Sequence, residues 1–140
     1  MRLRTAEQLS LETPAQKKRA ERGKQAEIAA AEYYRARGFT VLFQNLRLGA
    51  LELDLVLRNN DLVVVAEVRT RAPSSYVSAL ASVTKPKRVA LFRAIERLWT
   101  KHLVKMPEVQ RVRVDIVAVR LLEGGTEVEV IEGALTMNDA

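Results

Sequence analysis

Apolar and polar residues alternate along the stretch Leu-Glu-Leu-Asp-Leu-Val-Leu at residues 51–57. Successive side chains point to opposite faces of a β-strand, so this alternation predicts a strand over residues 52–58. Its four leucines are predicted to share one face, and Glu52 and Asp54 to share the other. The stretch therefore predicts an acidic face on an otherwise apolar strand.

A second strand is predicted over residues 62–70, where an apolar run ends in Glu67, Arg69 and Arg71. These three polar residues occupy alternate positions and are therefore predicted to share one face. The sequence Asn-Asn-Asp at residues 59–61 separates the two strands. Because Asn and Asp tolerate the positive φ of tight turns, the two strands are predicted to form a β-hairpin.

The register of this hairpin decides which charged residues meet. A two-residue turn places Glu52 opposite Glu67 with Asp54 on the diagonal, whereas a four-residue turn places Asp54 opposite Glu67 and Glu52 opposite Arg69. Only turns of even length keep the polar residues of both strands on one face. Either register gathers three carboxylates, which repel one another. The neighbouring arginines or a bound divalent cation must offset that repulsion.

The remaining chain predicts two helices and three further strands. Thr13-Pro14 is a suitable helix start, Gly38 a suitable end, and Gly23 a position where the helix can break. Residues 1–13 are predicted to be a mobile basic tail, and residues 14–140 a single domain. The other expected elements are strands at 39–43, 111–121 and 127–131, and a helix that begins after Thr84 and ends at Met106-Pro107. The predicted order is α-β-β-β-α-β-β, a mixed α+β fold.

Length and composition exclude several classes of protein. A chain of 140 residues with 48% hydrophobic residues suits one globular domain, and no apolar run approaches the ~20 residues of a membrane-spanning helix. The absence of cysteine excludes disulfide scaffolds, zinc–thiolate sites and thiol nucleophiles, and a single histidine cannot build a multi-histidine metal site. We therefore expect a cytoplasmic protein without a membrane partner.

Charge is distributed unevenly along the chain, whose formal net charge is +6. Residues 1–24 carry a net charge of +4 and residues 69–113 one of +9, whereas residues 25–68 carry −2 and residues 114–140 carry −5. An acidic cluster between two basic segments suits a protein that binds a polyanion and holds a cation at its centre. DNA is the expected partner, although a solvated basic surface would give the same totals.

Several short segments, taken in order, carry a resemblance to a known family. They are Gly23-Lys24-Gln25-Ala26-Glu27, Gln44-Asn45-Leu46-Arg47, Glu52-Leu53-Asp54-Leu55-Val56, Glu67-Val68-Arg69-Thr70-Arg71, Ser82-Val83-Thr84-Lys85 and Arg113-Val114-Asp115-Ile116-Val117. The chain resembles the YraN-like family of small, largely uncharacterised bacterial proteins. That family belongs to the PD-(D/E)XK nuclease-like superfamily and is related to Holliday-junction resolvases. The resemblance implies a restriction-endonuclease-like core, with a central mixed sheet flanked by helices.

The resemblance also implies a metal site and a reaction. Asp54 and Glu67 match the superfamily's Mg²⁺ (or Mn²⁺) ligands, and Glu27 matches a first-helix glutamate that often completes the site; Glu52 is a further candidate ligand. Mg²⁺ prefers oxygen ligands and lowers the pKa of a bound water. The implied activity is hydrolysis of DNA phosphodiester bonds, in branched or damaged DNA, and the related resolvases suggest a homodimer by analogy.

One position departs from the superfamily pattern, because Arg69 stands where the matching motif has lysine. Arginine keeps its charge and can stabilise a transition state, but it cannot act as a base at neutral pH. It also pairs with carboxylates, so Arg69 can fold onto Glu52 or Glu67 in place of a metal. Two alternatives therefore remain open, a catalytically silent DNA-binding module and a protein-interaction scaffold on the same fold.

Several other residues carry expectations of their own. Lys85, Lys87 and Arg88 crowd a predicted helix start, where the helix dipole disfavours cations, so phosphate contact is their expected use, together with Arg71. Ordinary surface lysines would give the same pattern. Outside the candidate site, Phe92 and Trp99 are predicted to lie in the core, and Asp115 to be a buried structural residue paired with Arg111 and Arg113.

Overall fold

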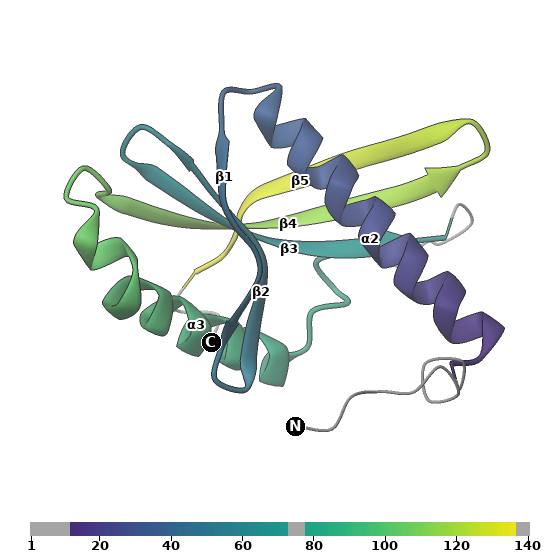
Figure 1. The fold of residues 1–140 in the computed structure, drawn as a ribbon, viewed down its shortest axis with the longest axis horizontal. Helices are drawn as coiled ribbons and strands as arrows, with labels where there is room; N and C mark the ends of the chain where they lie inside the picture. The colour runs from purple at the N-terminus through teal and green to yellow at the C-terminus, as the bar shows by residue number, and fades with distance from the viewer. Residues whose placement is uncertain (1–11, 73–77, 137–140) are drawn as a thin grey trace, which may run out of the picture.

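The computed structural model describes residues 12–72 and 78–136, and over these ranges it forms one sheet with a helix against each face (Figure 1). The predicted mobile tail at residues 1–13 lies almost wholly outside the described residues. The elements are α2 (Pro14–Arg35), β1 (Thr40–Leu48), β2 (Leu51–Asn59), β3 (Leu62–Arg71), α3 (Lys85–Lys101), the short 3₁₀ helix η1 (Leu103–Lys105), β4 (Arg111–Leu122) and β5 (Gly125–Leu135).

The five strands lie side by side in the order β1-β2-β3-β4-β5. Neighbouring strands are antiparallel except for β3 and β4, which run parallel because the chain crosses over through α3 between them. The predicted mixed α+β fold and the element order α-β-β-β-α-β-β are confirmed. No described helix is long and apolar enough to cross a membrane.

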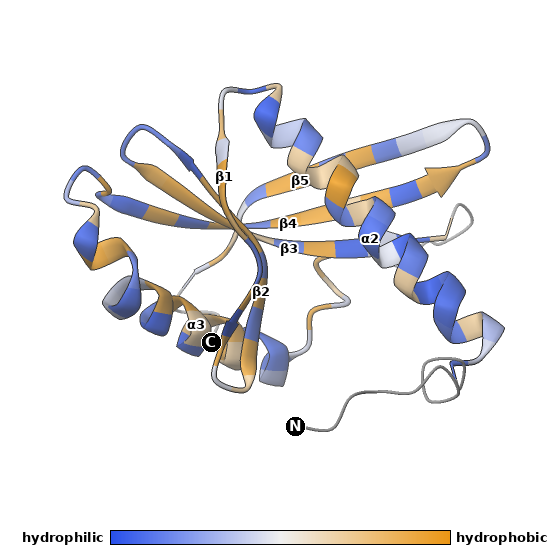
Figure 2. Ribbon diagram, viewed as in Figure 1, coloured by the Kyte–Doolittle hydropathy of each residue, from blue (hydrophilic) through white to orange (hydrophobic). Residues whose placement is uncertain are grey.

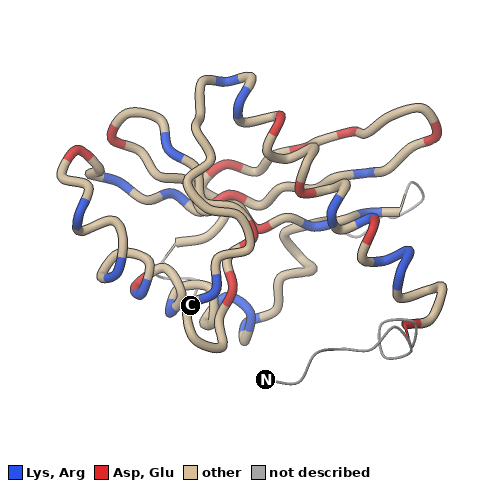
Figure 3. The backbone as a smooth tube through the Cα atoms, in the orientation of Figure 1, with Lys and Arg blue, Asp and Glu red and all other residues tan. Residues whose placement is uncertain are grey.

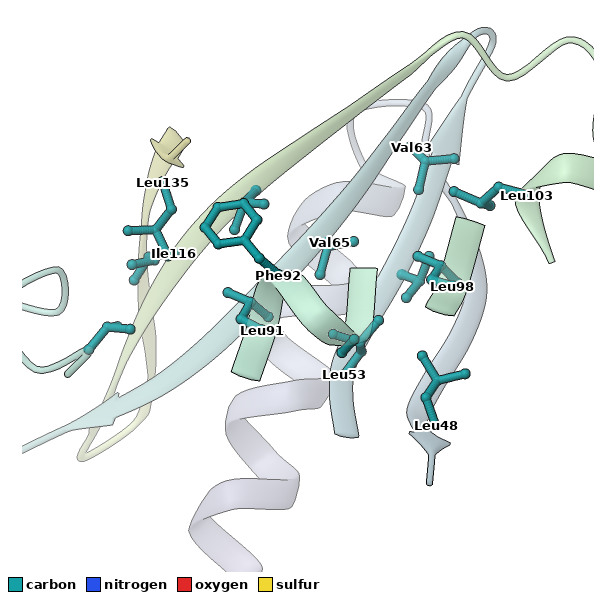
Figure 4. Packing of buried hydrophobic residues seen from close by; sticks show 14 of the residues in the cluster. Leu48, Leu53, Val63, Val65, Leu91, Phe92, Leu98, Leu103, Ile116 and Leu135 are labelled. Carbon is teal, nitrogen blue, oxygen red and sulfur yellow. The ribbon is translucent and has the colours of Figure 1, made fainter. Parts of the chain in front are cut away.

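Two apolar clusters, one on each face of the sheet, hold the helices in place. On one face α3 packs through Leu91, Ala94 and Leu98 against the strands (Figure 4). On the other face α2 packs through small residues, Ala26, Ala29, Ala30 and Ala31, and through Tyr34. Alanine side chains let the α2 backbone approach the sheet closely. The first turns of α2 are hydrophilic and exposed (Figure 2).

Both helices begin as the sequence predicts. The Thr13 hydroxyl accepts a hydrogen bond from the Gln16 amide, and the Gln16 side chain accepts one from the Thr13 amide, which completes a capping box. The Thr84 hydroxyl caps α3 by accepting a hydrogen bond from the Lys87 amide, without a reciprocal side-chain contact. Gly23 does not break α2. The first strand is also longer than predicted, because β1 runs on to Leu48 beside β2.

The β2–β3 hairpin has one of the two registers that the sequence left open. Asn59 pairs with Leu62, so Asn60 and Asp61 form the turn, and Asn60 adopts a positive φ of 54°. The pairing continues to Leu55 and Ala66 and stops there. One step further, this register sets Asp54 against Glu67. The observed pairing is therefore that of the predicted four-residue turn, closed by one additional pair.

The leucines of β2 do not share one face, and that prediction is wrong. Leu55 and Leu57 pack in the α2-side cluster, whereas Leu53 packs in the α3-side cluster. On the amino-terminal side of Leu55, β2 is paired with β1 but no longer with β3. Two-stranded ribbons twist more strongly than wider sheets. The face of β2 therefore rotates at the position of Asp54.

Asp115 is fully buried and serves as the centre of a structural network, as predicted. Its carboxylate accepts hydrogen bonds from the Arg113 guanidinium (2.8 and 2.9 Å), the Tyr34 hydroxyl (2.7 Å) and the Gly133 amide (3.0 Å). The network ties α2 to β4 and β5. Arg111 does not take part, because it pairs with Asp61 at 3.2 Å instead.

The two aromatic residues predicted in the core of α3 differ. Phe92 is buried, but Trp99 is 38% exposed. The buried stripe of α3 runs through Leu91, Ala94 and Leu98, and Trp99 lies one residue further, about 100° around the helix. Its predicted core position is therefore wrong.

Candidate functional site

Asp54 lies where β2 separates from β3. One of its carboxylate oxygens, Oδ2, accepts a hydrogen bond from the Val68 amide at 2.9 Å. The backbone pairing of the two strands has ended two residues earlier, so a side chain replaces the backbone as the acceptor. This contact holds the Asp54 carboxylate beside β3, next to Glu67.

Glu67 is the second carboxylate of the site, and it is only 4% exposed. Its Oε1 atom lies 3.4 Å from the Arg69 guanidinium and 3.5 Å from the Lys87 ammonium. Its other oxygen, Oε2, is buried and has no hydrogen-bond partner among the described residues. A buried polar atom without a partner is costly, and in native proteins it often marks a functional position.

The electrostatics of the two carboxylates reflect this burial. Burial and the neighbouring Asp54 charge raise the pKa of Glu67 to about 7, although Lys87 and Arg69 favour its ionised form. Burial likewise raises the pKa of Asp54, against the Val68 hydrogen bond and the charges of Lys87 and Arg69. The two cations therefore do not fully compensate the pair, which leaves it able to attract further positive charge.

Glu27 reaches the same region from α2. Its carboxylate accepts a hydrogen bond from the Asn45 side chain at 3.1 Å and borders a hollow of about 420 Å³ between α2 and β1. Burial raises the pKa of Glu27, and the charges of Asp54 and Glu52 raise it further, although Asn45 favours the ionised form. The site thus draws on α2, β2, β3 and α3.

Glu52 lies at the edge of the site and is more exposed than Asp54 and Glu67. Its side chain is 40% exposed and its nearest cation is Arg47, at 3.8 Å on β1. Over residues 12–72 and 78–136, no three His, Cys, Asp or Glu side chains gather tightly enough to form a ready-made metal site. The structure therefore brings Asp54 and Glu67 together and leaves Glu52 at the edge.

The four predicted nucleic-acid-binding residues differ in what they contact. Lys87 turns inward to Glu67, and Arg88 donates to the Val83 carbonyl at 3.1 Å, beside the start of α3. Lys85 is exposed, and Arg71 donates to the Ser78 carbonyl at 3.3 Å. Sequence analysis missed the position of Lys87 because twenty residues separate it from Glu67. The predicted order of strand, helix and strand was the available signal, because a crossover connection between parallel strands brings its helix back beside the sheet.

Arg69 contacts Glu67, as the departure from the lysine motif led us to expect. The contact uses one guanidinium nitrogen and one carboxylate oxygen, and the Arg69 Nε atom is buried without a partner among the described residues. The pairing is therefore not bidentate. It leaves the buried Glu67 Oε2 without a partner among the described residues, so Arg69 has not taken the whole carboxylate in place of a metal.

A comparison with family models identifies the relatives of this chain. The model of the uncharacterised protein family UPF0102 matches residues 26–119, about two thirds of the sequence. The chain belongs to family UPF0102. The matched stretch includes Asp54, Glu67 and Lys87, and also Glu27 near its beginning.

Curated UPF0102 proteins match over most of their own length. The one from Sorangium cellulosum is 38% identical over 122 residues, which cover 86% of this chain and 85% of that protein. The one from Methylococcus capsulatus is 36% identical and covers 81% and 89%, and the one from Streptomyces coelicolor is 37% identical and covers 76% and 81%. The names of these UPF0102 proteins state no activity.

Proposed function

We propose that this UPF0102 protein is a metal-dependent nuclease of the PD-(D/E)XK type, which hydrolyses phosphodiester bonds of DNA. The observation that carries the proposal is the meeting of Asp54 and Glu67 where β2 leaves β3, with Glu67 Oε2 buried and unpartnered. A pair of carboxylates with raised pKa values beside two cations has the composition of a phosphoryl-transfer site.

The chemistry of these residues fits a Mg²⁺ or Mn²⁺ ion. The two carboxylates offer the hard oxygen atoms that both ions prefer, and the unpartnered Oε2 atom of Glu67 is an available ligand. We propose Asp54 and Glu67 as the ligands, with Glu27 in support from α2. The bound ion would supply an activated water and shield the charge of the phosphodiester.

The cations of the site have roles that the chain itself can perform. Lys87 lies 3.5 Å from the Glu67 oxygen and carries an ammonium that can move a short distance to meet a phosphate. Arg69 presents a fixed positive charge from the same strand as Glu67. We propose that Lys87 takes the place of the lysine that the motif lacks at position 69, and that Arg69 stabilises negative charge that develops on the phosphate.

The charge of the surrounding chain supports a nucleic acid as the substrate. Residues 69–113, which include the end of β3 and all of α3, carry a net charge of +9. Figure 3 shows Lys and Arg positions recurring along α3 and towards the carboxyl end of β3. A positive surface around a negative centre attracts the phosphate backbone and holds it over the carboxylates.

Cleavage assays test the proposal directly. We expect the wild-type protein to cut at least one of linear, single-stranded and four-way-junction DNA in Mn²⁺ but not in EDTA. Asp54→Ala should lower the rate by about 100-fold or more, because a lost ligand removes both ion and activated water. Asp61→Ala, on the turn of the same hairpin, is the matched control and should cut like wild type. Equal cutting by the Asp54 and Asp61 variants would rule the proposed site out.

The proposed role of Lys87 has its own test, in which Lys85→Ala serves as control on the same helix. Lys87→Ala should lower kcat by about 100-fold, and it should raise the pH at which activity appears, because Lys87 favours the ionised form of Glu67. Lys85→Ala should leave kcat and the pH profile unchanged. If both variants lose only DNA affinity, Lys87 contributes to binding and not to the reaction.

One observation favours a second function, a catalytically silent DNA-binding module. Glu67 Oε1 already lies beside two cations, which occupy the position next to that oxygen where a metal would otherwise bind. Titration calorimetry with Mn²⁺ separates the two functions. A binding heat that Asp54→Ala abolishes supports the nuclease. DNA binding without any Mn²⁺ heat supports the silent module.

A further inference from the structure

Three arginines surround a hollow at the carboxyl end of β3, away from the carboxylate pair. Its volume is about 440 Å³, which lies within the range of small-ligand sites. Arg19 and Arg22 come from the exposed first turns of α2, and Arg71 is the last residue of β3. The remaining lining residues are Thr70, Ala72 and Leu121.

No negative charge within the described chain balances these arginines. Arg19 and Arg22 lie three residues apart, on one side of α2, and neither forms an ion pair or hydrogen bond with residues 12–72 or 78–136. Arg71 donates one bond to the Ser78 carbonyl, while its Nε atom is buried without a partner among the described residues. None of the six lining residues is acidic.

The strand register adds a fourth arginine nearby. In the parallel pairing of β3 with β4, Arg71 lies beside Arg120. Arg120 in turn lies opposite Glu127 on β5, so its charge has an acidic neighbour and the proposed pocket does not depend on it. The buried Nε–H of Arg71 needs an acceptor that the described protein does not supply. An anion in the hollow would supply that acceptor.

Phosphate is the anion whose chemistry fits best. The guanidinium fork donates two parallel hydrogen bonds to phosphate oxygens, and Arg19, Arg22 and Arg71 approach from two different elements. Arg71 lies four residues along β3 from Glu67, which corresponds to about 13 Å. This separation equals about four base steps along one strand of B-DNA. Arg19 and Arg22 lie on the α2 side of the sheet and Lys87 on the α3 side, so a nucleic acid bound at the carboxylate pair would reach the hollow by passing around the end of β3.

We propose that Arg19, Arg22 and Arg71 form a phosphate-binding pocket that holds one phosphate of the nucleic acid, away from the bond to be cut. This inference rests on the proposed function for the identity of the molecule that carries the phosphate. The phosphate is either a strand terminus or an internal phosphodiester. Arg19 and Arg22 precede residue 26, where the family match begins, whereas Arg71 lies within the match. The pocket therefore combines residues from inside and outside the matched region.

DNA binding in EDTA tests the pocket apart from cleavage. The double variant Arg19→Ala/Arg22→Ala should bind DNA about tenfold or more weakly than wild type, because it loses charge-assisted contacts to one phosphate. The control Lys17→Ala/Lys18→Ala removes the same charge from the same helix, but neither lysine lines the pocket. It should bind within about threefold of wild type, since diffuse charge contributes less than direct contact.

Matched oligonucleotides identify the source of the phosphate. A loss of affinity that appears only with 5′-phosphorylated strands assigns the pocket to a terminal phosphate. An equal loss with 5′-hydroxyl strands assigns it to an internal phosphodiester. Equal weakening by the two double variants would overturn the pocket, although DNA binding and cleavage would stand. A wild-type protein that binds no DNA would overturn the proposed function and the pocket with it.

Discussion

Glu67→Gln is expected to make the metal-free protein more stable at pH 8 and to leave its stability unchanged near pH 4.5. In the folded protein Glu67 keeps its proton until its pKa of about 7, whereas an unfolded chain releases it near the ordinary value of 4.5. Between these values the folded state binds more protons, so the free energy of unfolding falls as pH rises. The cost above pH 7 is about 3 kcal/mol at most, and glutamine does not incur it.

Urea unfolding in EDTA at pH 4.5, 6 and 8 measures this effect. Glu96→Gln, an exposed position on α3, is the matched control and should change stability by little at any pH. A stabilisation by Glu67→Gln that grows with pH supports the conclusion that burial raises the pKa of Glu67 in the folded protein. A pH-independent difference between Glu67→Gln and wild type would show that Glu67 does not titrate as described.

The same substitution should remove the response to metal. A ligand that binds only the folded state stabilises it by mass action, so Mn²⁺ should raise the Tm of wild type. Glu67→Gln should show no such increase, since the amide is a poor replacement for the carboxylate. Stability and metal binding would then move in opposite directions at one residue, as is common where function requires a costly buried charge.

Asp115→Ala is expected to produce the largest loss of stability in the chain, about 3–5 kcal/mol. The substitution leaves the Arg113 guanidinium, the Tyr34 hydroxyl and the Gly133 amide without their shared acceptor. Asp115 is fully buried, and Tyr34 is only 1% exposed, so water cannot readily replace the lost contacts. The protein should therefore unfold at much lower urea concentration than wild type.

Tyr34→Phe provides a graded comparison for the Asp115 substitution. It removes one donor and keeps the aromatic packing against Tyr33 and Phe39, so it should cost about 1–2 kcal/mol. Equilibrium unfolding followed by circular dichroism measures both variants. If Asp115→Ala costs no more than Tyr34→Phe, the carboxylate is not the centre of the network.

The sequence predicted the order of the elements and the two strands that hold the carboxylates. Alternating polarity was sufficient there, because Glu67, Arg69 and Arg71 had to share a face once the strand was assigned. It was not sufficient to choose the hairpin register. Asn59, Asn60 and Asp61 all tolerate a turn, so their chemistry does not distinguish the two closures.

The features that sequence analysis missed depend on tertiary structure. Leu53 and Leu55 lie on different faces of the sheet because β2 twists away from β3. The alternation of side chains along a strand does not predict such a twist. Lys87 meets Glu67 because the crossover brings α3 back beside the sheet. A local charge argument could only describe Lys87 as a cation near a helix start. Trp99 was misplaced because a wide apolar stripe on α3 does not define which edge is exposed.

Because α2 runs without interruption through Gly23, its two ends are parts of one rigid rod. Each residue added to an α-helix turns everything beyond it by about 100°. An insertion or deletion between Arg22 and Glu27 would therefore swing the arginines of the hollow away from the sheet, or lift Glu27 off Asn45. Natural variation in length should be absent from this segment. The exposed turn between β4 and β5 supports neither the arginines of the hollow nor Glu27, so we expect insertions to be tolerated there.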